Sequence, residues 1–329
     1  MKKTSLYIFF HIPKCAGSTF RYHLEHNLRK GEFVSLYEGE YFDVTEMSYK
    51  YFTPGKRREE IDSYFSRLTD EQKDTIKILY GHQVYYGIHR FFPGREARYI
   101  TFVRHHAARE VSMYNFYREH IEDPSRRFLK KENVYQANDV KEILKDLIRD
   151  GRVLSFSEWL RERTWHSNFI TRFLIHRGFT EPEASPEDML KKFYFVGITE
   201  NYQNDALFLY YLLGVKKFYP DKNISKKYFH LKDLSKELYN IISERNKRDA
   251  GLYDCAICLH ETFKVAEPHF ERIVGYMKLK VFYSRRSISF WIAYDRVTSA
   301  LRRHTPLFAR LLDNARKSIS SFKNRRVNF

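Results

Sequence analysis

The chain is poor in cysteine and lacks long apolar runs. Three cysteines in 329 residues exclude a small fold held by a disulfide framework and fit a reducing compartment. No apolar stretch approaches the roughly 20 residues that a membrane-spanning helix requires. The N-terminal Met1-Lys2-Lys3 and the following "TSLYIFF" resemble a signal peptide only superficially, because the apolar run is short and ends at His11. We expect a buried first strand there.

Acidic residues are scarce relative to basic ones. The sequence has 41 Asp and Glu against 58 Lys and Arg, a formal net charge of +17, which predicts acidic partners. Much of the excess lies near the C-terminus, where residues 275–329 contain 13 basic and 2 acidic residues. With 43% hydrophobic and 17% aromatic residues the chain is nevertheless expected to fold, and we find no internal repeat or low-complexity tract.

Short apolar runs alternate with amphipathic helical patterns along the chain. Strands are expected at 5–10, 76–80, 98–103 and 193–198, and helices at 18–29, 58–68, 107–119 and 202–213. This alternation predicts an α/β fold of three layers, P-loop-like, in which helices flank a central and mainly parallel sheet. Binding sites in such sheets gather at the carboxyl ends of the strands.

Two parts are expected along the chain. Residues 1–274 should form the main domain, and residues 275–329 a basic, aromatic C-terminal extension. The highly charged segment 120–150 is predicted to be an insertion or a lid, and the segment 233–264 to be helical. The extension suits three alternatives that the sequence does not separate: contact with an anionic membrane surface, contact with nucleic acid, or a helical extension packed on the domain.

The stretch "HIPKCAGSTF", residues 11–20, lies where the first strand should lead into a helix. Free N–H groups and a partial positive charge at a helix start favour an anion. Gly17 permits close approach of the backbone, and Lys14 supplies a positive charge, while Ser18 and Thr19 supply hydroxyl groups. The lysine stands four residues before Ser18, so the stretch is not a Walker A sequence. The alternative is an ordinary turn with a solvated lysine and Ser18 as the N-cap.

A second stretch, "YITFVRHHAAREVSMYNFY", covers residues 99–117. Arg104 stands where another apolar strand should lead into a helix, so we expect it at the same edge of the sheet as Lys14. Ser112 follows eight residues later, about two helical turns on. Arginine suits bidentate contact with a terminal phosphate, and a serine hydroxyl can complete such a site. Taken alone, an arginine at a helix start is usually a surface residue.

Together the two stretches resemble the carbohydrate sulfotransferases that use 3′-phosphoadenosine 5′-phosphosulfate (PAPS), particularly the heparan sulfate 2-O-sulfotransferases and their bacterial relatives. Further similarity lies in "LYGHQVYYGIH" (79–89), "HSNFITRFL" (166–174) and "FVGITENYQNDALFLYYLLG" (195–214). The resemblance thus covers about residues 5–260. The second stretch departs from the common "RDP" form, because His105 and His106 replace Asp and Pro, which leaves the start of that helix open.

The resemblance implies an enzyme of EC 2.8.2 type that moves the sulfuryl group of PAPS to a hydroxyl of a glycan, polysaccharide or glycolipid, releases 3′-phosphoadenosine 5′-phosphate (PAP) and needs no metal. Lys14 would be catalytic, by neutralising the bridging oxygen as the bond to PAP breaks. Arg104 and Ser112 would hold the 3′-phosphate. The residues implied at the 5′ end are those of the first stretch: Lys14, Cys15, Ala16, Gly17, Ser18, Thr19 and Phe20.

The resemblance also implies a catalytic base. His82, just past the expected strand 76–80, aligns with the catalytic histidine of the 2-O-sulfotransferase group, and an imidazole suits proton transfer near neutral pH. The alternative is a histidine in an exposed loop. The reserve candidates for the base are His89, Glu38 and Glu40. Arg172 and Asn168 are candidates for binding the nucleotide or the acceptor.

Other signals weigh less. Cys255 and Cys258 with His260 suggest zinc, but a closed site needs a fourth ligand, so we expect core packing there. Cys15 would be reactive if the helix N-terminus lowered its pKa.

Besides the enzyme, the alternatives are a nucleic-acid- or membrane-surface-binding protein with a nucleotide-binding core, and a P-loop kinase, which the missing Walker A disfavours. The resemblance, together with the absence of a signal peptide or membrane anchor in the sequence, predicts a bacterial cytoplasmic protein. If the extension binds lipid, we expect the protein at the inner face of the membrane.

Overall fold

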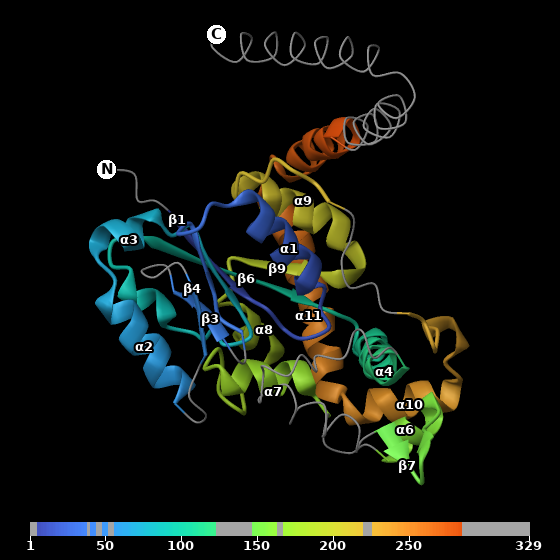
Figure 1. The fold of residues 1–329 in the computed structure, drawn as a ribbon. Helices are drawn as coiled ribbons and strands as arrows, with labels where there is room; N and C mark the ends of the chain where they lie inside the picture. The colour runs from blue at the N-terminus through green and yellow to red at the C-terminus, as the bar shows by residue number, and fades with distance from the viewer. Residues whose placement is uncertain are drawn as a thin grey trace, which may run out of the picture. The chain divides into compact units, whose positions relative to one another are not determined.

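The computed structural model describes residues 5–37, 40–43, 48–51, 56–122, 147–162, 167–219 and 226–284. The chain forms two compact units, residues 1–216 with 220–274, and residues 217–219 with 275–329. The first unit contains the sheet and its helices (Figure 1). Most of the predicted C-terminal extension, residues 285–329, lies outside the described residues, so its membrane and nucleic-acid contacts stay predictions. In the described ranges, we find no helix with the length and apolarity to cross a membrane.

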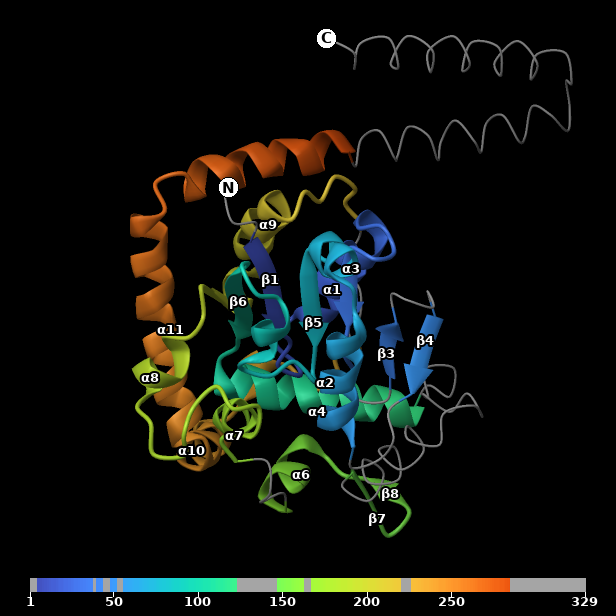
Figure 2. The same ribbon diagram turned by 90° about the vertical axis from the view of Figure 1, so that its left-hand side faces the viewer.

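The central sheet has five strands, and every pair of neighbours runs parallel. Its order is β2 (Phe33–Ser35), β5 (Ile78–Gly81), β1 (Ser5–Phe10), β6 (Glu96–Val103) and β9 (Phe195–Ile198). Figure 2 shows β5, β1 and β6 side by side in the middle of the sheet. The predicted α/β fold with a parallel sheet is therefore confirmed. Within this sheet only β2, which is three residues long, had no predicted counterpart.

Neighbouring residues of β1 cover opposite faces of the sheet, as the strand's period of two requires. Phe9 packs edge-on against Phe20 of α1 (Gly17–Asn27), with ring centroids 4.8 Å apart. Phe10 instead stacks on Phe173 of α7 (Phe169–His176) at 5.1 Å and contacts Phe179 at 4.5 Å. Helices therefore lie on both faces, and the central strand is buried between them.

The remaining helices and strands complete this unit. Its other α-helices are α2 (Arg57–Arg67), α3 (Asp70–Thr75), α4 (His106–Glu122), α6 (Phe156–Glu162), α8 (Pro186–Leu190), α9 (Tyr202–Leu212), α10 (Lys236–Arg245) and α11 (Lys247–Ala266). Two hairpins pair β3 (Glu40–Asp43) with β4 (Ser48–Tyr51), and β7 (Ile148–Arg149) with β8 (Arg152–Val153). Helix α4 follows β6 directly. The single helical pattern predicted at 233–264 is two helices, because Asn246 ends α10 before α11 begins.

The two ends of the segment 120–150 contribute side chains to the core. Residues 120–122 are the last turn of α4, where His120 is buried. Leu147 is also fully buried, in a cluster with Tyr114 and Trp159. At each end one side chain is therefore packed in the core, whereas Glu122, Arg149 and Asp150 are exposed. Residues 123–146 lie outside the described part of the chain, so the lid stays a prediction there.

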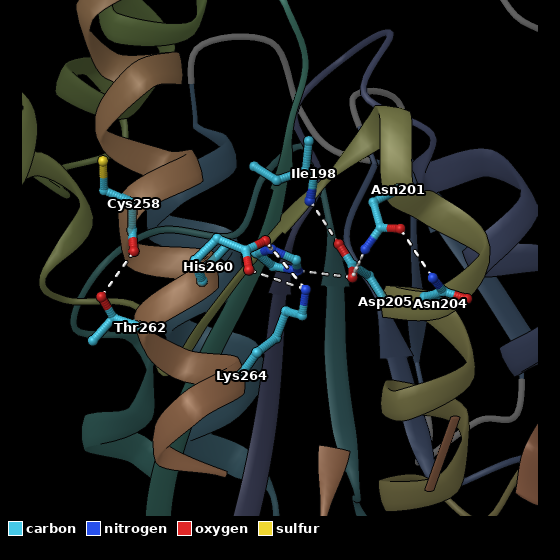
Figure 3. Close-up of polar contacts among 9 residues, drawn as sticks. Ile198, Asn201, Asn204, Asp205, Cys258, His260, Thr262 and Lys264 are labelled. Atoms are coloured by element: carbon cyan, nitrogen blue, oxygen red, sulfur yellow. Dashed lines mark hydrogen bonds and ion pairs between the residues drawn. The ribbon is translucent and has the colours of Figure 1, made fainter. Parts of the chain in front are cut away.

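A buried carboxylate joins β9 to two helices. Asp205 on α9 is wholly buried, and its Oδ2 accepts a hydrogen bond from the backbone N–H of Ile198 at 2.8 Å. Its Oδ1 accepts from Asn201 Nδ2 and is 2.8 Å from Nε2 of His260 on α11 (Figure 3). Because the carboxylate can only accept, His260 carries its proton on Nε2. Asp205 thus fixes the carboxyl end of β9 relative to α9 and α11.

Replacing Asp205 by Ala is expected to lower the free energy of unfolding by about 3 kcal/mol, because three donors lose their acceptor in the interior. Urea unfolding followed by circular dichroism measures the change. The matched control is Asp188→Ala, whose carboxylate is exposed and pairs with Lys191 on the surface, so a much smaller loss is expected. Equal losses in the two variants would contradict the role given to Asp205.

Candidate functional site

The backbone between β1 and α1 is bent into an anion-binding shape. Lys14 has φ 68° and Ala16 has φ 64°, both in the left-handed region that residues other than glycine rarely adopt. Each such residue costs on the order of 1–3 kcal/mol, and such strain gathers at functional sites. Left-handed residues that alternate with ordinary ones turn successive N–H groups toward one concave surface. The loop is therefore suited to hold phosphate or sulfonate oxygens, although the N–H groups of His11 and Cys15 already donate to the carbonyls of Gly81 and Ile12.

The start of α1 is not capped by a side chain. Ala16 occupies the N-cap position and makes no side-chain hydrogen bond, and the first turn has no acidic residue. Ser18 is the second residue of the helix, so its predicted alternative role as the N-cap is wrong. The first N–H groups thus keep their partial positive charge for an anion. The ring of Phe20 points away into the core, where it stacks on Tyr210 at 5.3 Å, so only its backbone remains for a cofactor.

The structure brings the two sequence stretches together. Strands β1 and β6 are parallel neighbours, with Phe10 opposite Thr101, so both stretches leave the same edge of the sheet. Arg104 Nη1 donates to the backbone carbonyl of Lys14 at 3.1 Å. Arg104 Nε is buried and has no hydrogen-bond partner among the described residues. Ser112 lies two turns along α4 from Arg104 and is partly exposed.

Lys14 lies in an unusually cationic environment. Its Nζ is 4.0 Å from the centroid of the Phe116 ring on α4. Burial, followed by the positive charges of Arg104 and Arg109, lowers the pKa of Lys14 from its ordinary 10.5 to about 7. An anion bound here would reverse that shift, because it stabilises the charged ammonium. Lys14 is therefore prepared for an anionic ligand.

Arg109 is the site residue that the sequence did not reveal. It lies on α4, is 1% exposed, and pairs through Nη1 with Glu110 Oε1 at 2.8 Å. Its Nε and Nη2 have no hydrogen-bond partner in the described ranges, and its guanidinium lies 3.8 Å from the centroid of the Phe169 ring. A lone arginine in a helical pattern predicts a surface position. The only available signal was its place between Arg104 and Ser112.

Cys15 is not the reactive thiol that its position suggested. It is 1% exposed, and burial raises the pKa of its thiol to about 12, although Arg109 and Arg104 act in the opposite direction. The desolvation of the thiolate outweighs the positive charge at the start of α1. Cys15 therefore contributes its backbone and its packing to the loop.

His82 immediately follows β5 and is anchored by its Nδ1, which lies 2.6 Å from the backbone carbonyl oxygen of His11. A carbonyl only accepts, so Nδ1 carries the proton and Nε2 is the basic nitrogen of the neutral ring. Burial lowers the pKa of His82 to about 4, with smaller contributions from Arg177 and Arg21. Nε2 has no hydrogen-bond partner within the described part of the chain. The ring is thus neutral at pH 7, with its base atom free.

The other predicted site residues lie elsewhere or are otherwise engaged. His89 Nδ1 lies 2.9 Å from the hydroxyl of Tyr99. Arg172 is exposed on α7. Glu38 lies outside the described residues, and Glu40 opens β3 with an undescribed side chain, so neither is tested as a base.

Asn168 has a structural function at the start of α11. Its Oδ1 accepts from the backbone N–H groups of Arg248 at 2.9 Å and Asp249 at 3.3 Å. In return, Asn246 Oδ1 accepts from the backbone N–H of Asn168. The side-chain oxygen of Asn168 therefore couples the start of α7 to that of α11, and binding of nucleotide or acceptor by Asn168 stays a prediction.

The suspected zinc ligands are separated. His260 points to Asp205, while Cys258 is an exposed residue of α11 whose backbone carbonyl accepts from Thr262 (Figure 3). Over the described ranges no group of three or more His, Cys, Asp and Glu side chains is placed to hold a metal ion.

Two stretches suited to binding anions meet at one edge of a parallel sheet, and the first of them contacts a neutral histidine, an arrangement that suits group transfer. The family model of sulfotransferases matches residues 1–255. The chain belongs to the sulfotransferase family. It is thus a transferase that moves sulfuryl groups, and the P-loop-like fold is that of the family. A search of curated proteins gives no match.

Proposed function

We propose that this sulfotransferase takes its sulfuryl group from PAPS and transfers it to a hydroxyl group of a carbohydrate. The observation that carries the proposal is the hydrogen bond from Arg104 to the Lys14 carbonyl, because it makes one site of two anion-binding stretches. A donor with anionic groups at both its 5′ and 3′ ends needs such a paired site. Sulfotransferases of this family generally use PAPS, and the residues present fit it: an uncapped helix start, a buried Arg104 Nε without a partner, and Lys14.

In this proposal the chain's own groups have separate functions. The backbone N–H groups of Lys14 and of residues 16–19, with the hydroxyls of Ser18 and Thr19, hold the 5′ end, while Arg104 and Ser112 hold the 3′-phosphate. PAPS supplies an activated sulfuryl group, and sulfuryl transfer, like phosphoryl transfer, depends mainly on positioning and electrostatic stabilisation. Lys14 stabilises the negative charge that grows on the leaving oxygen. His82 Nε2 accepts the proton of the acceptor hydroxyl.

A carbohydrate acceptor follows from the resemblance to the 2-O-sulfotransferase group and from the net charge of +17, which favours an acidic glycan. The alternative, a nucleic-acid- or membrane-binding protein with a nucleotide core, is less favoured because the family match extends through residue 255.

The two ends of the donor site can be separated by titration calorimetry with PAP and with an analogue that lacks the 3′-phosphate. Arg104→Ala should weaken PAP binding about 10- to 100-fold, the effect of a lost charged hydrogen bond, and weaken the analogue much less, through the lost bond to the Lys14 carbonyl. Lys14→Ala should weaken both ligands. Lys191→Ala, a surface lysine paired with Asp188, is the control. An equal loss of both ligands in Arg104→Ala would contradict the assignment of the 3′ site.

The pKa of Lys14 predicts a pH dependence of PAP binding. In the free protein this lysine loses its proton as the pH rises through about 7, so above that pH binding must take up a proton and becomes weaker. Lys14→Arg keeps its charge and should show a smaller loss of affinity between pH 6 and pH 9. Because ionisation of the phosphates of PAP affects both proteins alike, the difference between them isolates the lysine. Identical pH profiles would show that Lys14 stays charged throughout.

The base assignment predicts that His82→Asn lowers kcat by about 10²- to 10⁴-fold, the usual effect of losing a general base, while PAP binds as before. A radiolabelled sulfuryl-transfer assay on an acidic polysaccharide measures kcat, and calorimetry measures PAP affinity. His176→Asn, which changes an exposed histidine of α7, controls for the substitution. Unchanged kcat in His82→Asn would transfer the role of base to another residue.

A further inference from the structure

His11 is a buried histidine that the mechanism above does not use. It is 5% exposed and directly follows β1, at the start of the anion-binding loop. Its backbone carbonyl accepts the Nδ1–H of His82, and its ring lies against the His82 ring, with centroids 4.4 Å apart and planes tilted by 34°. Both the main chain and the side chain of His11 thus touch the proposed base.

The same ring packs against the first residue of α1. A Cβ atom added to Gly17 would lie 2.1 Å from His11 Cδ2 and 2.2 Å from Nε2, closer than real atoms approach. Glycine is therefore required at position 17 by the ring of His11, since no positive φ is recorded there. Any displacement of the first turn of α1 toward this ring is transmitted to it, because packed interiors do not deform freely.

Other contacts hold the His11 ring in place. Nδ1 of His11 lies 2.8 Å from the hydroxyl of Tyr37, and the ring stacks on Phe9 with an interplanar angle of 14°. Tyr37 also meets His82 edge-on, at 4.9 Å and 83°. Arg21 of α1 covers the Tyr37 ring at 4.4 Å. His11, Tyr37 and the proposed base His82 therefore form one packed group next to the start of α1.

The His11 ring is neutral at pH 7. Burial, then the charges of His82, Arg21 and Lys14, lowers the pKa of His11 well below its ordinary value. A neutral His11 adds no repulsion when the neighbouring His82 takes up a proton.

We propose that His11 is a positioning residue that couples occupation of the anion-binding loop to the orientation of His82. Nucleotide oxygens held by the loop fix Gly17 and the first turn of α1, these fix the His11 ring, and the ring fixes the imidazole whose Nε2 must face the acceptor. The inference rests on the proposed function. It adds that the donor nucleotide orders the base before the acceptor hydroxyl arrives.

Three variants test this coupling. His11→Asn keeps the backbone carbonyl but removes the ring, and Tyr37→Phe keeps the ring but removes the hydroxyl bonded to it. His176→Asn is the matched control on the surface. Ring ¹⁵N signals of His82, observed with and without PAP in protein labelled on histidine, report its tautomer and environment. Calorimetry and the transfer assay give PAP affinity, kcat and KM, and circular dichroism verifies folding.

In the wild type, PAP should shift the His82 ring signals while Nδ1 stays protonated. In His11→Asn we expect the response to PAP to disappear and kcat to fall about 10- to 100-fold, as for a misplaced catalytic group, with PAP affinity within about threefold of wild type. Tyr37→Phe should show a smaller loss of the same kind. If His11→Asn does not fold, Tyr37→Phe decides the matter by itself.

The outcomes separate the two proposals. If the wild type binds PAP and transfers sulfuryl groups but the variants keep both kcat and the His82 response, the coupling is overturned and the function stands. Loss of PAP affinity and kcat together, with no selective change at His82, also overturns it, because His11 would then only hold the loop. If the wild type neither binds PAP nor transfers sulfuryl groups, both proposals fail.

Discussion

The convergence of three positive side chains at one edge of the sheet is the constraint on which the site depends. Burial lowers the pKa of Lys14 to about 7, and the positive charges of Arg104 and Arg109 add to that effect. Such an arrangement is costly without a partner, because a charge withdrawn from water must be paired or neutralised. In the free protein, Lys14 can release its proton near neutral pH, which removes one of the three charges. An anionic ligand instead offsets the repulsion by pairing with them.

Of the buried carboxylates, Glu110 pairs with Arg109, whereas Asp249 and Asp205 accept hydrogen bonds from the backbone. Asp249 accepts from the N–H groups of Ile170 and Thr171 and from the Thr171 hydroxyl, so it fixes the start of α7. Asp205 does the same at the end of β9. Burial raises the pKa of Asp249, while these hydrogen bonds and Arg109 oppose that shift. The acidic groups therefore shape the site, and its net positive charge remains for the ligand.

The fold was predictable where burial and chain direction act together. The run 5–10, apolar from Leu6 onward, matches β1, and a parallel sheet necessarily brings Lys14 and Arg104 to one edge. Very short strands, and burial by residues distant in the sequence, were not predictable. β2 is too short to show a period, and Leu147 is buried by partners distant in sequence.

The details of the site escaped prediction for related reasons. Arg109 looks like a surface residue because sequence does not reveal what covers a helix face, and Cys15 combines a helix N-terminus with burial, of which burial has the larger effect. Asn168 matches a family element, yet its side-chain oxygen caps α11. In each case the residue type was informative, and its neighbours decided the function.

The low pKa of His82 fits a base that acts late in the transfer. An imidazole with a pKa of about 4 attracts protons weakly, so it would not deprotonate a free sugar hydroxyl in advance. As the hydroxyl oxygen donates electrons to the electrophile, however, its proton becomes acidic enough for a weak base. Burial, with smaller contributions from the charges of Arg177 and Arg21, disfavours a charged imidazole before the reaction. The site therefore keeps His82 neutral and ready, and relies on Lys14 and the start of α1 to promote departure of the leaving group, after which the proton moves to Nε2.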